Sequence, residues 1–399
     1  MKAGRFILRG GDIATPTRVI TEGALVIEAG RIAAVLETTP PLGGEDVRWV
    51  SGLIAPGFLD LHSDALEKEI RPRPGASMPV DLAIMELDRK LAGHGITTIA
   101  HAISFTETDG DIRAHRDSEQ VAWAIGKCVP TCLVRHLVHA RYEMTDTGAA
   151  PTVARLLDRD ALCMVSFMDH SPGGRQFKCL EDFVRYYSPV YGLDRPAVVR
   201  LVEEKNRRRQ EAVGTLEETL EGLAAAARRR GVILASHDDQ SAEQVAWARR
   251  LGVTISEFPV SAEAAEAART NGLHVVMGAP NLLRGQSTSG NLSALDAIRR
   301  GTLDSLCSDY YPAAMLHAVF KLCTEGHARL PEAFGLVSLH PARALGLDRE
   351  TGSLEAGKAA DLVIIGERRE IPVVTHTFRE GREVFVAGYK APLPACVTA

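Results

Sequence analysis

The chain has 399 residues, of which 45% are hydrophobic and 24% charged, and 51 acidic residues against 46 basic ones give a net charge of −5. This length fits two or three domains of roughly 150 residues, or one larger α/β barrel with a small second domain. A weakly acidic chain without a polybasic tail gives no basis for bulk attraction to nucleic acid or an anionic membrane, so neither is an expected partner.

Targeting signals and cysteine usage both point to the cytoplasm. No stretch approaches the roughly 18–20 uncharged apolar residues that span a bilayer, and residues 1–16 lack the apolar run of a secretory signal. Seven cysteines are scattered without a C-x-x-C pair. An odd, scattered set argues against a disulfide framework and against a structural zinc knot, so we expect a cytoplasmic protein with reduced thiols.

Short strands separated by turns are predicted at both ends of the chain. The first 52 residues contain FILRGGDIATP and GALVIEAGRIAAVL, in which apolar residues alternate with turn residues. The same alternation of apolar and turn residues occurs in residues 352–392, in GSLEAGKAADLVIIG and IPVVTHTFREGREVFVAG. Both ends therefore differ from the middle of the chain.

Residues 53–351 alternate apolar strands with helical segments, which is the pattern of βαβ units around a parallel sheet. Eight such strands close a (β/α)8 barrel, the fold we predict. Residues 178–230 are too long for an ordinary barrel helix and predict an inserted helical hairpin, as a lid or an oligomer contact. The candidate strands are residues 53–62, 95–104, 132–143, 161–170, 231–239, 252–258, 274–280 and 303–310.

Polar side chains lie at the carboxyl ends of these candidate strands. In a barrel those ends meet on the one face that carries the active sites of this fold. One polar residue there is an ordinary helix cap, but His, Asp or Glu at most of the strands indicates a functional site. The residues are His62, Asp64, His101, Glu143, Asp169, His170, His237, Asp238, Glu257, Asn281 and Asp309.

The motif LDLHSD at residues 59–64 indicates a metal site. On an extended segment His62 and Asp64 point to the same side, so both can bind one cation. Imidazole and carboxylate ligands suit one or two divalent ions, with zinc expected and manganese, iron and cobalt as alternatives. Such ions acidify water and hold an electrophile. The predicted ligands are His62, Asp64, Glu143, His170, His237 and Asp309.

Several strings together resemble the amidohydrolase superfamily: APGFLDLHSD, then SHDD and SDYYP, then GSLEAGKAADLVII. The resemblance covers nearly the whole chain. It implies a metal-bearing barrel over residues 53–351 and a small β-sandwich built from residues 1–52 and 352–392. The superfamily usually has H-x-H on the first strand, whereas Asp64 stands second here. No lysine ends a middle strand to be carboxylated, so Glu143 or Glu257 would have to supply a bridging carboxylate.

Longer strings resemble the branch of that superfamily that acts in phosphonate catabolism. They include HSDALEKEIRPRPG, VSFMDHSPGGRQF and MGAPNLLRGQSTSGN. H-x-D is that branch's own first-strand motif. The resemblance implies hydrolysis of α-D-ribose 1-methylphosphonate 5-triphosphate to the 5-phosphate and pyrophosphate, in the carbon–phosphorus lyase pathway.

A phosphorylated ribose as substrate requires cations near the metals, because planar guanidinium groups bind phosphate oxygens in pairs. Cationic and hydrogen-bonding residues follow the motifs at several strand ends. For catalysis we expect water to attack a phosphorus, with Asp309 accepting the proton and Asp238 as the alternative base. The predicted substrate-binding residues are Lys68, Arg71, Arg73, Arg141, Arg175, Asn281, Arg284, Ser287 and Ser289.

Two other functions stay open. A superfamily member can hydrolyse a C–N bond, as a deaminase or cyclic amidase does, although the cations near the motifs count against this. A metal-free scaffold protein is the second, and the retained His62, Asp64, His237 and Asp309 argue against it. A Rossmann protein is excluded, because neither G-x-G-x-x-G after a first strand nor GxxxxGK[ST] is present.

Two further expectations concern assembly and the other histidines. Many barrels of this type pair into dimers, so a homodimer is a candidate assembly, and the sequence leaves the oligomeric state open. His101, His136 and His139 are expected to be structural residues of the core.

Overall fold

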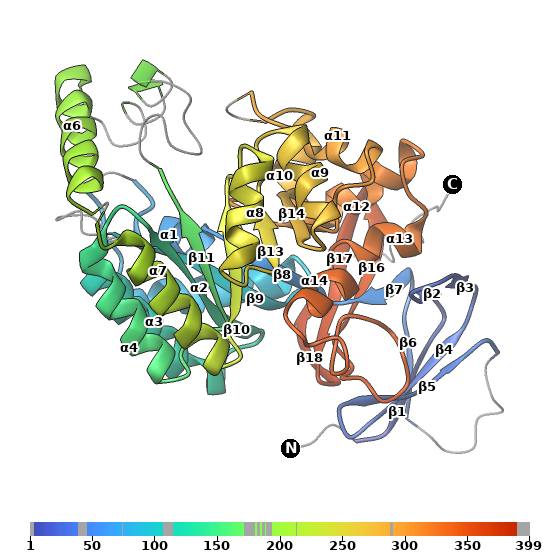
Figure 1. The fold of residues 1–399 in the computed structure, drawn as a ribbon. Helices are drawn as coiled ribbons and strands as arrows, with labels where there is room; N and C mark the ends of the chain where they lie inside the picture. Colours follow the sequence, from blue (N-terminus) through green and yellow to red (C-terminus); the bar gives the residue numbers. More distant parts are fainter. Residues whose placement is uncertain are drawn as a thin grey trace.

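The computed structural model describes residues 4–38, 46–73, 75–106, 115–170, 180–181, 184–185, 188, 194–212, 214–287 and 290–388. Its strands form three sheets, and the helices surround the largest of them (Figure 1). Among the helices in these ranges, none is long and apolar enough to cross a membrane.

Eight parallel strands, β8 to β15, lie side by side in chain order. A parallel bridge between Ser63 and Asp309 joins the first strand to the end of the last. The Asp64 N–H donates to the Asp309 carbonyl (2.6 Å) and the Asp309 N–H donates to the His62 carbonyl (3.0 Å). The predicted (β/α)8 barrel is therefore confirmed. Its strands are β8 (Phe58–Ser63), β9 (Ile96–Phe105), β10 (Arg135–Glu143), β11 (Met164–Met168), β12 (Ile233–His237), β13 (Ile255–Glu257), β14 (His274–Gly278) and β15 (Ser305–Cys307).

Helices between the strands cover the outside of the barrel, and a large apolar core fills the layer between, with Leu87, Val138 and Val153 fully or almost fully buried. Ser241 and Ser261 begin two of these helices, where each hydroxyl accepts a backbone N–H of the first turn. The helices are α1 (Ala65–Ile70), α2 (Val80–Gly93), α3 (His115–Cys128), α4 (Ala150–Asp158), α6 (Arg195–Ala212), α7 (Leu216–Arg229), α8 (Ala242–Arg250), α9 (Ala262–Thr270), α10 (Ala279–Arg284), α11 (Ala294–Arg299), α12 (Ala314–Thr324), α13 (Leu330–Gly335) and α14 (Leu339–Ala344).

A second, smaller apolar cluster comes from the other face of the barrel strands. Leu59 and Leu61 of β8 pack there with Ile255, Val276 and Cys307 of later strands. Because side chains alternate between the two faces of a strand, these residues fill the barrel interior while their neighbours meet the helices. This part of the interior is therefore a packed apolar layer.

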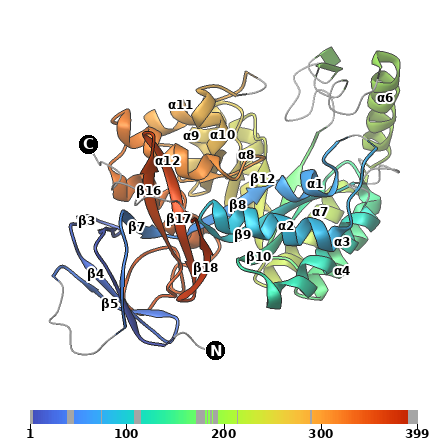
Figure 2. The ribbon, with the colours of Figure 1, turned by 180° about the vertical axis from the view of Figure 1, so that it is seen from behind.

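The two remaining sheets come from the chain ends. One has the order β5-β4-β1-β6, and the other, β18-β17-β16-β7-β2-β3, combines strands from both ends (Figure 2). Phe6 and Leu25 of the first sheet pack against Ile364 and Phe378 of the second, as in a β-sandwich. The strands are β1 (Phe6–Arg9), β2 (Asp12–Ala14), β3 (Val19–Ile20), β4 (Ala24–Glu28), β5 (Arg31–Leu36), β6 (Asp46–Trp49), β7 (Leu53–Pro56), β16 (Leu362–Arg368), β17 (Ile371–Arg379) and β18 (Arg382–Val386).

The first candidate strand, residues 53–62, is in fact two strands in different sheets. β7 pairs with β16 and β2 in the mixed sheet, whereas β8 pairs with β9 in the barrel. Gly57 lies between them, and a Cβ at that position would come within 2.4 Å of the Thr97 side chain. Only glycine fits this junction, so the chain changes sheets there and the first barrel strand begins at Phe58 rather than at residue 53.

The predicted insertion is smaller than residues 178–230. α7 is an ordinary barrel helix, because its buried residues Leu220, Leu223 and Ala227 face α4 and β12. Among the described residues of this stretch, α6 is the helix that stands away from the barrel in both views (Figures 1 and 2). The remainder of the predicted hairpin falls largely outside the described residues.

A buried carboxylate ties α2 to the barrel. Asp88 accepts the backbone N–H groups of Leu133 (2.8 Å) and Val134 (3.0 Å), and its Oδ1 also lies 3.0 Å from His136 Nε2. Burial by itself raises the pKa of Asp88, but these three donors outweigh it and lower that pKa below its ordinary value of 3.8. Asp88 therefore holds the start of β10 against the helix.

The same network accounts for two of the other histidines. His136 Nδ1 lies 2.7 Å from His101 Nε2, and the two rings stack. Asp88, Cys132 and His136 are close enough to resemble a metal site. The backbone hydrogen bonds to Asp88 give this group a structural explanation without a metal.

Replacing Asp88 with alanine is expected to lower the free energy of unfolding by about 3 kcal/mol, because two backbone N–H groups and His136 would be left buried without an acceptor. Asp81→Ala, at an exposed position on the same helix, is the matched control and is expected to change it by less than about 0.5 kcal/mol. Urea denaturation measures both. Because the pKa of Asp88 is lowered in the folded state, its contribution is present above pH 3.8 and is lost as the pH falls below that value. Equal effects of the two substitutions would contradict this role.

Candidate metal centre

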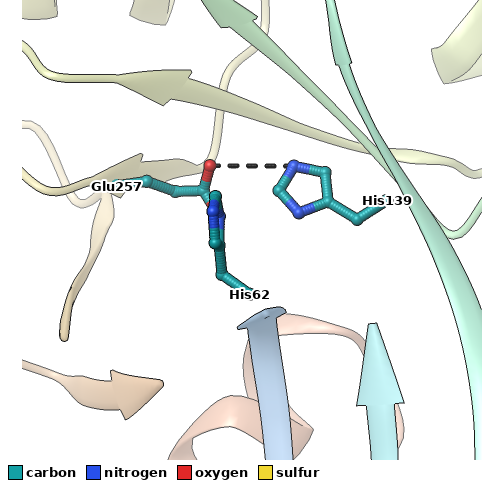
Figure 3. Close-up of side chains that lie close together, drawn as sticks. All are labelled: His62, His139 and Glu257. Atoms are coloured by element: carbon teal, nitrogen blue, oxygen red, sulfur yellow. Dashed lines mark hydrogen bonds and ion pairs between the residues drawn. The ribbon is translucent and has the colours of Figure 1, made fainter. Parts of the chain in front are cut away.

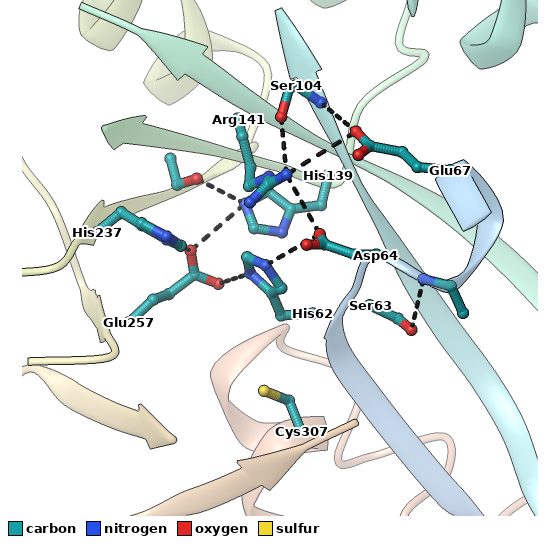
Figure 4. A network of polar contacts seen from close by, with 12 residues as sticks. His62, Ser63, Asp64, Glu67, Ser104, His139, Arg141, His237, Glu257 and Cys307 are labelled. Carbon is teal, nitrogen blue, oxygen red and sulfur yellow. Dashed lines mark hydrogen bonds and ion pairs between the residues drawn. The ribbon is translucent and has the colours of Figure 1, made fainter. Parts of the chain in front are cut away.

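The barrel closure places the first-strand motif beside the last strand. His62 is the second-last residue of β8, with its side chain 1% exposed, and Asp64 lies just before the first residue of α1. His62 Nε2 lies 3.7 Å from Asp64 Oδ1. Asp309 is hydrogen-bonded to this segment through both backbone groups. The polar network around these residues lies at the carboxyl ends of the strands, as predicted (Figure 4).

Glu257, at the end of β13, is the centre of that network. Its Oε1 lies 3.0 Å from His62 Nδ1 and its Oε2 lies 3.3 Å from His237 Nδ1. His139 Nε2 is 3.7 Å from the same Oε2 (Figure 3). The carboxylate is completely buried, so three imidazole rings from three different strands surround one acidic group.

A second group lies next to the first and shares His237. His170 Nε2 and His237 Nε2 each lie 3.6 Å from Asp238 Oδ2. Glu143, at the end of β10, accepts the backbone N–H of His170 (3.1 Å) and the hydroxyl of Thr145 (3.0 Å). The structure therefore brings His170, His237 and Asp238 together, and Glu143 holds the backbone of His170.

Burial and neighbouring charges shift the pKa values of these groups strongly. Burial acts to lower the pKa of His62, but the charge of Glu257, together with the polar contacts to Asp64 and Glu257, outweighs it and raises that pKa to about 10. Burial, followed by the nearby Asp64, raises the pKa of Asp309 to about 7. Burial acts to raise the pKa of Glu257, yet the surrounding imidazoles bring it well below its ordinary range. These are the shifts expected where charges gather in a site that excludes water.

Backbone strain gathers at the same strand ends. Asp238, Phe258 and Asp309 have φ angles of 56°, 53° and 55°, in the left-handed region that non-glycine residues rarely adopt. The Phe258 ring packs edge-on against the rings of His62 and His237 at 4.9 and 5.2 Å. Strained residues of this kind cluster at functional sites, where the surrounding structure holds them.

The donor set fits a divalent cation. Four imidazoles and two carboxylates lie within two small groups, one of His62, His139 and Glu257 and one of His170, His237 and Asp238, and these are the ligand types that zinc and related ions take. Burial lowers the pKa of His139 to about 3, so this ring is neutral, as a metal ligand must be. Its Nδ1 is buried without a hydrogen-bond partner among the described residues. A cation would compensate the carboxylates and occupy such an orphaned nitrogen.

The predicted substrate-binding residues fall into two sets. Arg141 is buried, 3.2 Å from Asp64 and 2.7 Å from the Ser104 hydroxyl, and Lys68 lies 4.5 Å above the ring of Tyr310, next to Asp309. Arg71 and Arg73 follow α1.

The other set lies further along the chain. Asn281 hydrogen-bonds to backbone groups of Leu292 and Ala294, which holds a loop rather than pointing to the network. Arg284 is exposed at the end of α10 and Ser287 is partly buried. Arg175 and Ser289 lie outside the described residues.

The sequence did not predict the contacts of two residues of the network. His139, expected to be structural, points into the same cluster as His62, and Glu257 was considered only as a bridging carboxylate. The alternation of His139, Arg141 and Glu143 along one strand is the signal that predicts a shared inward face. The position of Glu257 at a strand end made it a candidate, but no signal along the chain reveals its partners, because they come from distant strands.

Comparison with known proteins identifies relatives over most of the chain. The model of the amidohydrolase family matches residues 53–386. The α-D-ribose 1-methylphosphonate 5-triphosphate diphosphatase of Escherichia coli is 36% identical over 374 residues, which cover 92% of this chain and 97% of that protein. An imidazolonepropionase of Pseudomonas aeruginosa is 33% identical over 156 residues, covering 36% of this chain and 38% of that enzyme.

Solved structures share the fold at low sequence identity. A Xaa-Pro dipeptidase has a TM-score of 0.66 at 13% identity, with 96% of this chain and 100% of that chain covered. The N-acetyl-D-glucosamine-6-phosphate deacetylase of Mycobacterium smegmatis has a TM-score of 0.62 at 16% identity, with the same coverage. These similarities support the barrel and the sandwich, and they carry no information about the substrate.

The purified protein is expected to hold at least about one equivalent of zinc after dialysis, and His237→Ala is expected to weaken zinc binding by more than about 100-fold, because this ring takes part in both groups. Elemental analysis and competition with a chelator measure the two quantities. His376→Ala, on β17 of the mixed sheet, is the control and should leave zinc binding unchanged. Wild-type zinc affinity in the His237 variant would rule out this centre.

Proposed function

The chain belongs to the amidohydrolase family, and we propose that within it this protein hydrolyses α-D-ribose 1-methylphosphonate 5-triphosphate to the 5-phosphate and pyrophosphate in phosphonate catabolism. The observation that carries the proposal is the 36% identity to the Escherichia coli diphosphatase over 92% of this chain and 97% of that protein. An alignment that covers 92% of this chain includes most of both the sandwich and the barrel.

The residues at the strand ends would hold one or two divalent metal ions. His62, Asp64 and Asp309 meet at the barrel closure, and His170, His237 and Asp238 meet beside them. Zinc is the ion we propose. When bound, a divalent cation acidifies water and withdraws charge from a phosphoryl oxygen.

The protein's own side chains would accept the proton and bind the phosphate groups. Asp309 would accept the proton of the attacking water at its carboxylate, and Asp238 is the alternative base. Attack at the α-phosphorus breaks the α–β anhydride, so that the ribose keeps one phosphate and pyrophosphate leaves. Lys68, beside Tyr310 and Asp309, can bind the departing pyrophosphate, and Arg141 holds Asp64 in place.

Cleavage of a C–N bond is the second candidate. The partial match to imidazolonepropionase favours it, since that enzyme shares 33% identity over 36% of this chain. The cations near the network count against it, because a neutral amide does not need them. A metal-free scaffold is disfavoured by the shared partners of His62, His237 and Glu257.

The proposal predicts the products of a phosphorus NMR experiment. Purified protein with Zn²⁺ or Mn²⁺ is given a ribose 1-alkylphosphonate 5-triphosphate, with ATP in a parallel sample. We expect pyrophosphate and the 5-monophosphate, and Asp309→Asn is expected to lower the rate by about 10³-fold or more, because both a ligand and the proton acceptor are lost.

Asp158→Asn is the matched control for that variant, since it makes the same chemical change at an exposed site at the end of α4. It is expected to keep the wild-type rate. An intact triphosphate in the presence of protein with bound metal would contradict the diphosphatase proposal, and amide and amidine substrates would then be tested.

Lys68→Met is expected to raise the KM for the triphosphate by about 10-fold with a smaller effect on kcat, since one charge-assisted contact to phosphate is lost. Lys127→Met, at an exposed position near the end of α3, should leave both constants unchanged. Steady-state kinetics with pyrophosphate detection measures them. An unchanged KM in the Lys68 variant would remove Lys68 from the substrate site.

A further inference from the structure

The carboxylate of Glu257 contacts two of the imidazoles that are proposed to bind the metal. Glu257 places one oxygen 3.0 Å from Nδ1 of His62 and the other 3.3 Å from Nδ1 of His237. The two rings stack at 5.4 Å with an angle of 25° between their planes. The two histidines come from β8 and β12, so this single side chain connects strands that are not neighbours in the sheet (Figure 4).

The chemistry of these contacts determines which nitrogen carries the proton. An ionised carboxylate only accepts hydrogen bonds, so a ring nitrogen within hydrogen-bond distance of it must carry hydrogen. A histidine ring that binds a cation keeps only one hydrogen, which leaves the lone pair on the other nitrogen. That other nitrogen, Nε2, lies beyond hydrogen-bond distance from the neighbouring carboxylates, 3.7 Å from Asp64 Oδ1 in His62 and 3.6 Å from Asp238 Oδ2 in His237. With a cation bound, the lone pairs would therefore point toward the two carboxylates that follow these histidines in the chain.

The position of Glu257 is itself firmly held. Its side chain is completely buried, its carbonyl accepts the Asp238 N–H at 2.9 Å, and Phe258 after it packs its ring against both imidazoles. With both carboxylate oxygens engaged by ring nitrogens, Glu257 has no oxygen aimed at Asp64 or Asp238. It is therefore poorly placed for the bridging role considered from the sequence.

We propose that Glu257 is the positioning residue of the centre, which fixes Nε2 as the metal-binding atom of both His62 and His237. The inference rests on the proposed metal dependence of the enzyme and adds the residue that orients the ligands. Carboxylates that orient ligating histidines in this way tune metal affinity without touching the metal. Glu257 does not orient the ring of His139 in this way, because His139 Nε2 is hydrogen-bonded to the Ser166 hydroxyl at 2.9 Å.

The wild-type protein provides the first test. In zinc-loaded protein with ¹⁵N-labelled histidine, long-range ¹H–¹⁵N spectra distinguish a ring that carries hydrogen on Nδ1 from one that carries it on Nε2. We expect His62 and His237, assigned by their alanine variants, to carry hydrogen on Nδ1 and to have metal-shifted Nε2 signals. Hydrogen on Nε2 of either ring would overturn the proposal, and this result does not depend on any variant of Glu257 folding.

Glu257→Gln provides the second test. The glutamine amide is nearly the same shape, but its NH2 group donates and can no longer accept from one of the two rings. We expect the zinc dissociation constant to rise by about 10–100-fold, and one histidine to move to the Nε2–H form. Wild-type affinity with both rings unchanged would overturn the proposal.

Asp239→Asn is the matched control for this substitution. Asp239 is as buried as Glu257 and accepts the hydroxyls of Ser236 and Ser256 on the same two strands, β12 and β13. It is expected to leave zinc affinity within about twofold of wild type, as for other sites that do not orient a ligand. An equal loss of affinity in both variants would overturn a specific role for Glu257.

These measurements use zinc alone and are independent of the substrate. Triphosphate left intact by zinc-loaded protein overturns the proposed diphosphatase reaction and leaves the role of Glu257 standing. Wild-type protein that binds no zinc overturns the positioning role together with the metal dependence.

Discussion

The hydrogen bonds that close the barrel between β8 and β15 are the constraint on which the site depends. They run from Asp64 to Asp309 and from Asp309 back to His62, through backbone atoms alone. Residues some 250 positions apart in the chain (62 and 309) are thereby held at neighbouring strand ends. Backbone pairing is stiff and insensitive to side-chain identity, so the polar groups can be selected for chemistry while the sheet keeps their spacing.

The regular parts of the fold were predictable because they depend on local patterns. Apolar strands alternating with helices indicate a barrel, and polar strand ends indicate where its site lies. The change of sheet at Gly57 was not predicted, because Pro56 and Gly57 only interrupt the run of residues 53–62 and do not reveal that its two halves pair with different strands. α7 was likewise assigned to an insertion, since only tertiary contacts reveal that its apolar face covers β12.

In the site, too, the features set by local sequence patterns were predictable and those set by tertiary contacts were not. His62 and Asp64 could be recognised from period-two spacing, and His237 and Asp309 from their position at strand ends. Glu257 acquires its meaning from two imidazoles that approach it from separate strands. Asn281 shows the converse, since a polar residue at a strand end is engaged by the backbone of Leu292 and Ala294. Spacing along a chain reveals partners within one strand and not partners across the barrel.

The passage of the chain through Gly57 also has a consequence for folding during synthesis. β7 lies between β2 and β16 in its sheet, and β16 begins at Leu362, more than 300 residues after β7. On a ribosome, one edge of β7 therefore stays unpaired until almost the whole barrel has emerged. Such late pairing is slow and leaves an apolar strand edge exposed in the meantime. The nascent chain would carry its first-strand metal motif next to a strand whose sheet is completed only after β16 has been made.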